Sequence, residues 1–362
     1  AYEIRNCDWS SDVCSSDLTR IFPPDRNHLG YLPKLGKTAN FRCSPMHENS
    51  LISPHPPAPP TCDDIFRAHE RINKRVEWTP VVNSPNLDSV LGCEAHLKCE
   101  QLQGMGAFKI RGAMNAVLCL REAGINGAVA THSSGNHGAA LAAAARDDGR
   151  LATVVMPENA LPSKIENVRR HGGEIQFCDA TQRAREEGLA SLIAGGHIAV
   201  HPYDQFEVIA GQGTVAIEMF QQVPELDILL MPIGGGGLAA GCALVANELS
   251  PATRVIAAEP AGAADTAESL ELGRRIQQFK PDTIADGLRA LLGATNFLVL
   301  KEHLDRVITV SEAGILNAMK LLETQLDMRI EPSSATAIAA IQESPAVFKG
   351  QRVGIVITGG NS

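Results

Sequence analysis

Continuous apolar runs alternate with amphipathic helical segments along most of this chain. The runs are rich in Val, Ile and Leu, the pattern of strands that are buried on both faces. They lie at 128–130, 152–156, 175–177, 198–200, 227–233, 254–258, 306–310 and 353–357. The helical segments between them include 136–146, 180–194, 208–223 and 238–249. This alternation predicts an α/β protein of doubly wound type with parallel sheets, whose ligands bind at the carboxyl ends of the strands.

Local patterns extend this prediction to the segments that precede the first buried run. Apolar residues within 65–76 recur at helical spacing, and Thr61 or Asp63 could cap that helix. Residues 94–99 alternate between polar and apolar, as a strand does. Farther along, Ser163 and Glu166 have the spacing of a capping box, which predicts a helix start there.

The first 60 residues differ from the rest of the chain. Residues 8–18 resemble an in-frame translation of a sequencing-library adapter, and residues 53–60 are rich in proline. Met46 is the first plausible start, and the secretory signal pattern is not found around it. We therefore expect residues 1–60 to be a disordered or artefactual extension, with the folded part beginning near Thr61.

Composition limits the classes of partner. The chain has 362 residues, of which 44% are hydrophobic, so it can build a large core. Its net charge is −9 and its basic residues are scattered, which argues against nucleic acid and anionic membranes as partners. Its apolar runs are too short to span a bilayer. The nine cysteines form no C-x-x-C pair, which favours reduced thiols and a cytoplasmic location.

The segment 104–113 places Lys109 where a strand-like run gives way to a helix, with glycines on both sides. A lysine that is buried at such a junction has a lowered pKa and can attack a carbonyl group. An ordinary surface lysine in the first turn of a helix fits this segment equally well. The choice between the two interpretations depends on the remaining motifs.

Two loops between a strand and a helix carry groups that bind anions. Residues 131–138 combine hydroxyls, an amide and the free N–H groups of a helix start, which suit a carboxylate. The four glycines at 234–237 let the backbone approach a ligand closely and lead into another helix. This second loop lacks the Gly-Lys-Ser/Thr of nucleotide-binding loops and the G-x-G-x-x-G pattern. It therefore suits a phosphorylated cofactor better than a nucleoside triphosphate.

Together with Thr358, these motifs resemble the fold-type-II pyridoxal-phosphate enzymes, in the branch of serine/threonine dehydratases and serine racemases. The resemblance extends from about Thr61 to the end of the chain. It implies that pyridoxal 5'-phosphate forms a Schiff base with Lys109, is flanked by Phe108 and has the neutral Thr358 beside its ring nitrogen. The positions assigned to the cofactor are Phe108, Lys109, Asn136, Gly234, Gly235, Gly236, Gly237, Gly287 and Thr358. Those assigned to the substrate are Ser133, Ser134, Asn136 and His137.

The same resemblance implies an organisation like that of tryptophan synthase β, with two doubly wound domains and mostly parallel sheets. Residues 61–126 and 205–362 would form the large, cofactor-binding domain. Residues 127–204 would form a small domain that closes over the substrate. A homodimer is the usual arrangement in this branch.

The expected reaction is β-elimination and deamination of a hydroxy amino acid, L-threonine to 2-oxobutanoate or L-serine to pyruvate, with release of ammonia. A neutral partner for the ring nitrogen makes the cofactor a weaker electron sink, which favours loss of a β-leaving group. Lys109 would take the Cα proton. The chain ends soon after Thr358, so we expect a catabolic enzyme without a regulatory domain.

Two other activities stay open. Ser134 would face Cα from the side opposite Lys109 and could be the second acid/base of a serine racemase, or it could only add a hydrogen bond to the substrate. Ala290, where serine racemases often have a serine, weakens the racemase interpretation. Arg289 could favour an acidic substrate, as in a 3-hydroxyaspartate dehydratase, or could be a plain surface charge. A cysteine-synthase-like transferase is disfavoured, because that family usually has Ser-Gly-Asn-Thr where this chain has Ser-Gly-Asn-His.

A divalent-cation site is also implied by the resemblance. Glu259 and Asp265 would supply carboxylates and Ala263 a carbonyl oxygen, a set that suits Mg²⁺ or Mn²⁺, with Ca²⁺ as a further candidate. Spacing alone would favour two solvated acids at a junction between a strand and a helix, and the surrounding resemblance favours the cation site.

Overall fold

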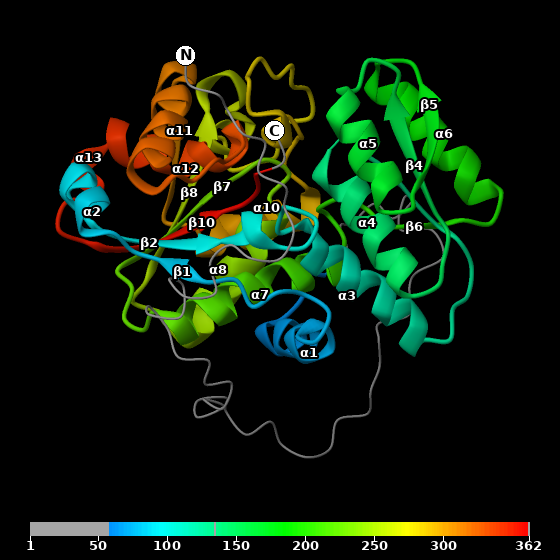
Figure 1. The fold of residues 1–362 in the computed structure, drawn as a ribbon, viewed down its shortest axis with the longest axis horizontal. Coiled ribbons are helices and arrows are strands. Elements are labelled where there is room, and N and C mark those ends of the chain that lie inside the picture. The colour runs from blue at the N-terminus through cyan, green and yellow to red at the C-terminus, as the bar shows by residue number, and fades with distance from the viewer. Residues whose placement is uncertain (1–57, 134, 361–362) are drawn as a thin grey trace, which may run out of the picture. The chain divides into compact units, whose positions relative to one another are not determined.

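The computed structural model describes residues 58–133 and 135–360. They belong to one compact unit, Met46–Ser362. This unit contains a six-stranded sheet in the order β1-β2-β10-β7-β8-β9 and a four-stranded sheet in the order β5-β4-β3-β6 (Figure 1). The predictions for residues 1–57 and for Ser134 lie outside the described residues.

The six-stranded sheet is parallel except for β1, which pairs antiparallel with β2. In the centre of the sheet, Ile355 of β10 pairs with Leu97 on one side and with Leu230 on the other. The strands are β1 (Val81–Val82), β2 (Glu94–Cys99), β7 (Ile228–Pro232), β8 (Arg254–Pro260), β9 (Arg306–Val310) and β10 (Arg352–Ile357). Strands β7 and β10 are almost wholly buried, as their continuous apolar runs predict.

Helices cover both faces of this sheet. Figure 1 shows α11 and α12 on one side and α1, α7 and α8 on the other. The Ala-rich α12 contacts β7, β8, β9 and β10, because its small side chains allow a close approach to the strands. The helices are α1 (Cys62–Ile72), α2 (Pro85–Leu91), α3 (Lys109–Glu122), α7 (Phe206–Gln222), α8 (Gly237–Leu249), α9 (Asp265–Glu271), α10 (Ala294–His303), α11 (Glu312–Leu326), α12 (Pro332–Glu343) and α13 (Pro345–Phe348). The described residues also contain three 3₁₀ turns, η2 (Glu100–Leu102), η3 (Ala261–Ala263) and η4 (Asp286–Leu288).

The four-stranded sheet is wholly parallel. Its strands are β3 (Val129–His132), β4 (Ala152–Pro157), β5 (Glu174–Cys178) and β6 (Ile198–Ala199), and its helices are α4 (Asn136–Asp147), α5 (Pro162–Arg170) and α6 (Gln182–Ala194). Helix α3 contacts both α4 and α7, so it joins the elements of the two sheets. Strands β3 to β6 and helices α4 to α6 all fall within 127–204, but the predicted domain boundary stays a prediction.

The α/β class and the mostly parallel sheets are confirmed. Thr61 caps α1 in a capping box with Asp64. The capping box predicted for Ser163 and Glu166 is wrong, because α5 begins at Pro162 and its start carries no side-chain cap. Proline suits the first helical position, where the N–H that it lacks would have had no partner in the helix.

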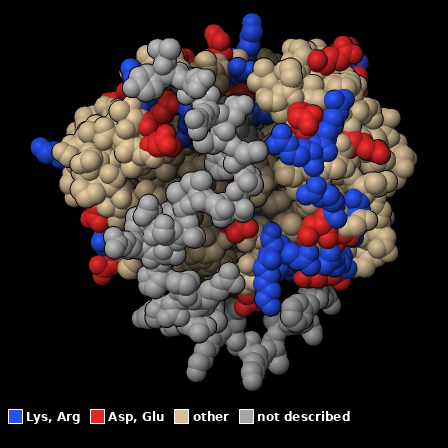
Figure 2. All heavy atoms as spheres, in the orientation of Figure 1, with Lys and Arg blue, Asp and Glu red and all other residues tan. Residues whose placement is uncertain are grey.

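Charged side chains of both signs share the face drawn in Figure 2, where Lys and Arg lie next to Asp and Glu. Ion pairs of the described residues include Arg71–Glu122 at 2.8 Å. Among the described helices, none is both long and apolar enough to cross a membrane.

Candidate active site

Lys109 is the first residue of α3 and lies beside the carboxyl end of β10. The Phe108 N–H donates to the Thr358 carbonyl at 3.0 Å, and Ala107 forms a bridge with Gly359. The Lys109 Nζ donates to the Pro202 carbonyl at 2.9 Å. The structure therefore brings the predicted lysine to the end of β10, which Thr358 follows directly.

The surroundings of the Lys109 amine increase the fraction of its neutral form. Burial lowers the pKa of Lys109 from 10.5 to about 8, although the Glu331 carboxylate opposes the shift. The amine also lies 5.1 Å from the centre of the Phe108 ring. A neutral amine is the form that attacks a carbonyl carbon, so these surroundings favour the nucleophile over the ordinary surface lysine.

The four glycines lie between β7 and α8, where side chains have no room. Gly236 has a φ of +91°. A Cβ atom on Gly235 would overlap the Tyr203 ring, and one on Gly237 would lie 2.5 Å from the Tyr203 carbonyl oxygen. Because α8 begins at Gly237, its first N–H groups have no partners within the helix and can bind an anion.

The loop after β3 reaches across to α12. Within the loop, the Gly135 N–H donates to Ser133 Oγ at 3.2 Å. The Asn136 amide donates to both carboxylate oxygens of Glu331, at 3.1 and 3.0 Å. Asn136 begins α4 and Glu331 precedes α12, so this contact joins the helix that follows β3 to a helix that covers the six-stranded sheet.

His137 lies deeper than the other predicted substrate residues. Its ring is buried, and Nε2 is 3.3 Å from the Val200 carbonyl oxygen. Burial lowers the pKa of His137 well below its ordinary value, so the ring is neutral. These contacts suit a residue that holds α4 against the end of β6, and its predicted role in substrate binding stays a prediction.

Thr358 and Gly287 lie near the other predicted groups. Thr358 Oγ1 is 2.9 Å from Ser334 Oγ, and Ser334 also donates to the Gly359 carbonyl at 2.8 Å. The Gly287 N–H donates to Ser333 Oγ at 3.0 Å. A Cβ atom on Gly234 would lie 3.1 Å from the Gly287 carbonyl oxygen, which places Gly287 beside the glycine loop.

The sequence profile of the pyridoxal-phosphate dependent enzymes matches residues 72–359. The chain belongs to this family.

Similarity to other proteins over most of the chain supports this assignment. A beta-hydroxyaspartate dehydratase from Paracoccus denitrificans (strain Pd 1222) is 45% identical, over 83% of this chain and 96% of that protein. The structure of maize serine racemase superimposes with a TM-score of 0.81 at 41% identity, over 84% of this chain and 94% of that one. The threonine deaminase of T.th. superimposes with a TM-score of 0.80 at 39% identity, over 84% of this chain and 99% of that one. The resemblance to fold-type-II pyridoxal-phosphate enzymes is thus confirmed.

The groups described above fit the cofactor of this family. Its aldehyde requires a neutral amine, which Lys109 can supply at its lowered pKa. Its phosphate requires N–H donors without bulky side chains, which Gly234–Gly237 and the start of α8 provide. Thr358, with Ser334 as its partner, presents a neutral hydroxyl. Each of these roles stays a prediction for the individual residue.

The predicted cation ligands lie close together at the end of β8. Glu259 accepts hydrogen bonds from the Thr266 and Ala267 N–H groups, at 3.2 and 2.8 Å. Asp265 Oδ2 accepts from the Leu292 N–H at 2.7 Å, and its Oδ1 is buried without a hydrogen-bond partner in the described part of the chain. Burial raises the pKa of Glu259 to about 8 and that of Asp265 to about 6.

Buried carboxylates in this arrangement suit a cation that prefers oxygen ligands. The buried Ala263 lies in η3, between the two acids. Within residues 58–133 and 135–360, His, Cys, Asp and Glu side chains form no group of three or more that could hold a metal ion. The site would thus depend on two carboxylates, a carbonyl and water, and it stays a prediction.

Sequence reasoning missed several residues that lie against the predicted site residues Asn136 and Gly235. Glu331 is buried, which raises its pKa. Lys164 lies 3.9 Å from Glu331 and 3.6 Å from Asp286. Tyr203 packs on the glycine loop. The only local signal for Glu331 is its place before the proline that begins α12, and that signal indicates a helix start rather than chemistry.

Proposed function

We propose that this protein catalyses the pyridoxal-phosphate-dependent β-elimination and deamination of L-threonine, L-serine or both. The products would be 2-oxobutanoate or pyruvate, with ammonia. The observation that supports the proposal most directly is the position of the Lys109 amine. This amine has a lowered pKa and lies at the carboxyl edge of the sheet, beside the end of β10, where Thr358 presents a neutral hydroxyl.

The positions of the side chains support the proposed roles. When bound, the cofactor supplies an electron sink for the Cα–H bond of the substrate. Lys109 removes the Cα proton, since its neutral amine is a base near pH 8. Ser133, Asn136 and the N–H groups at the start of α4 hold the substrate carboxylate. The Thr358–Ser334 hydroxyl pair leaves the ring nitrogen without a charged partner, which favours loss of the β-hydroxyl.

Two alternatives have support from relatives. Serine racemase is supported by the 41% identity to the maize enzyme, and Ser134 would then be the acid/base opposite Lys109. A 3-hydroxyaspartate dehydratase is supported by the 45% identity to the Paracoccus enzyme. Arg289 gives this second alternative little help, because its side chain is exposed and its guanidinium donates to the Thr283 carbonyl. Cytoplasmic location and a homodimer stay predictions from the sequence.

One set of incubations tests these activities together. The cofactor-loaded protein is supplied with L-threonine, L-serine or 3-hydroxyaspartate, and 2-oxo acid, ammonia and D-serine are measured from the same samples. The proposal predicts equal amounts of 2-oxo acid and ammonia from threonine or serine, and no product from Lys109→Ala. D-serine as the main product, or oxaloacetate formed only from 3-hydroxyaspartate, would favour the corresponding alternative. For racemisation, Ser134→Ala should reduce D-serine far more than pyruvate.

A further inference from the structure

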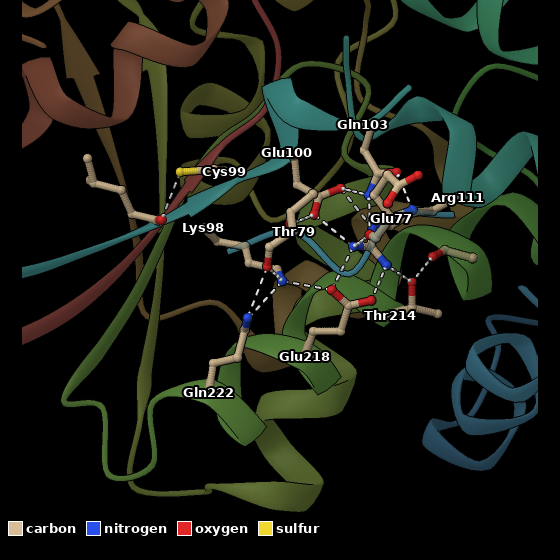
Figure 3. A network of polar contacts seen from close by, with 12 residues as sticks. Glu77, Thr79, Lys98, Cys99, Glu100, Gln103, Arg111, Thr214, Glu218 and Gln222 are labelled. Atoms are coloured by element: carbon tan, nitrogen blue, oxygen red, sulfur yellow. Dashed lines mark hydrogen bonds and ion pairs between the residues drawn. The ribbon is translucent and has the colours of Figure 1, made fainter. Parts of the chain in front are cut away.

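A network of buried charges joins α3, the helix that begins with Lys109, to η2 and α7 (Figure 3). Its centre is Arg111, two residues after Lys109 in α3 and fully buried. Arg111 Nε and Nη2 donate to the two oxygens of Glu100, both at 2.8 Å. Its Nη1 and Nη2 donate to the two oxygens of Glu218, at 2.6 and 2.8 Å. One guanidinium therefore forms two bidentate pairs, the strongest geometry for an arginine and a carboxylate.

The network fixes α3 to two other elements. Glu100 begins η2, directly after β2, and Glu218 belongs to α7. Lys98 of β2 donates to Glu218 at 2.7 Å and to the Thr79 carbonyl at 2.7 Å, and none of its hydrogen bonds goes to the described residues of α3 (Figure 3). Arg111 and Lys98 together balance the two carboxylates, so the network is neutral although it is buried.

Close backbone packing stiffens the same region. A Cβ atom on Gly112 would lie 2.8 Å from the Val208 carbonyl oxygen, and one on Gly211 would lie 2.6 Å from the Gly112 Cα. The first turn of α3 therefore touches α7 backbone to backbone. A rotation or a shift of this turn would break the bidentate pairs and create overlap at the glycines.

We propose that Arg111 is a positioning residue for the amine of Lys109. This inference rests on the proposed role of Lys109 as the residue that bonds the cofactor. Side chains two positions apart point to roughly opposite sides of a helix, so an anchor at Arg111 sets the direction in which Lys109 points. This role requires the planar guanidinium of Arg111, because Arg111→Lys keeps the charge but cannot form two bidentate pairs.

The test compares Arg111→Lys with Lys98→Met. Arg111→Lys removes the two bidentate pairs. Lys98→Met removes a positive charge of the same network whose hydrogen bonds go to residues outside α3. For each purified protein we would measure thermal unfolding, the rate of pyridoxal-phosphate attachment to Lys109 by borohydride trapping, and kcat and KM of the loaded enzyme. Arg183→Lys makes the same arginine-to-lysine substitution at an exposed ion pair and serves as the control.

We expect Arg111→Lys to lower both the attachment rate and kcat by about 10- to 100-fold, with KM nearly unchanged, because small misplacements of a reacting group cost about this much. Lys98→Met should lower the unfolding temperature and leave the attachment rate unchanged. An Arg111→Lys protein that is less stable but attaches the cofactor at the normal rate would overturn the inference. Equal losses of attachment in Arg111→Lys and Lys98→Met would overturn it too, since the effect would then follow stability.

Failure of the inference is distinguishable from failure of the proposed function. If the unmodified protein does not attach the cofactor to Lys109, both are overturned. If the unmodified protein attaches the cofactor to Lys109 and Arg111→Lys attaches it at the same rate, only the positioning role of Arg111 is overturned. If Arg111→Lys does not fold, Glu218→Gln tests the inference instead. It leaves the Arg111–Glu100 pair intact and weakens the Arg111–Glu218 pair. Attachment should then slow by about tenfold, and an unchanged rate would overturn the inference.

Discussion

The burial of the Lys109 amine predicts the pH at which the protein attaches its cofactor. Burial lowers the pKa of this amine from 10.5 to about 8. Only the neutral amine attacks an aldehyde. At pH 7 the neutral fraction would be about 0.03% at a pKa of 10.5 and about 9% at a pKa near 8. The gain is roughly 300-fold, which is 10 raised to the difference between 10.5 and 8.

The assay mixes cofactor-free protein with pyridoxal phosphate between pH 6 and pH 10 and follows the visible absorbance band that attachment creates. A small lysine peptide under the same conditions corrects for titration of the cofactor itself. The corrected rate should rise with pH, with a midpoint near 8, and then level off. Because the folded pKa is below the unfolded one, this amine should also make folding more favourable as pH rises from about 8 to about 10.5.

Glu331→Gln tests the direction in which a neighbouring charge shifts the pKa of Lys109. The Glu331 carboxylate raises the pKa of Lys109 against the effect of burial, so its removal should move the midpoint to lower pH. A midpoint near 10.5 in the unmodified protein would refute the reasoning, because the amine would then behave like an exposed lysine.

The remaining predictions concern the glycine loop and the cation site. Gly236→Ala should lower the free energy of unfolding in urea by about 2 to 4 kcal/mol. The residue has a φ of +91°, and the added Cβ atom would lie 2.7 Å from Leu292 Cδ1. Gly92→Ala, with a φ of +71° and open space, should cost only about 1 to 2 kcal/mol, and equal costs would contradict the role of the overlap. Mn²⁺, Mg²⁺ or Ca²⁺ at 100 times its dissociation constant should stabilise the protein by about 2.7 kcal/mol. Glu259→Gln should abolish this gain, and a gain that survives would place the cation elsewhere.

Local signals in the sequence were sufficient for much of the fold. The apolar runs at 227–233 and 353–357 became β7 and β10 within one residue, because strands buried on both faces need continuous apolar side chains. Lys109 was selected as a candidate for a similar reason, since glycines and a change from a strand-like run to a helix are visible in neighbouring residues. The same reliance on local spacing gave the wrong cap for α5, where Pro162 already begins the helix.

The parts that were missed depend on contacts between distant residues. Arg111 and Glu218 are separated by 107 positions, and Asn136 and Glu331 by 195. A periodic pattern reports which side of an element is buried but not which partner it meets. Ser334, the partner of Thr358, belongs to the first turn of an almost wholly buried helix, where a hydroxyl is indistinguishable in sequence from ordinary small packing residues.

The central claim is that Lys109 is the residue that bonds the cofactor. Its most direct test is borohydride reduction of the protein after incubation with pyridoxal phosphate, followed by digestion and mass spectrometry. We expect a reduced cofactor on the peptide that contains Lys109 and none in Lys109→Ala. A modification on another lysine such as Lys164, or none at all, would contradict it.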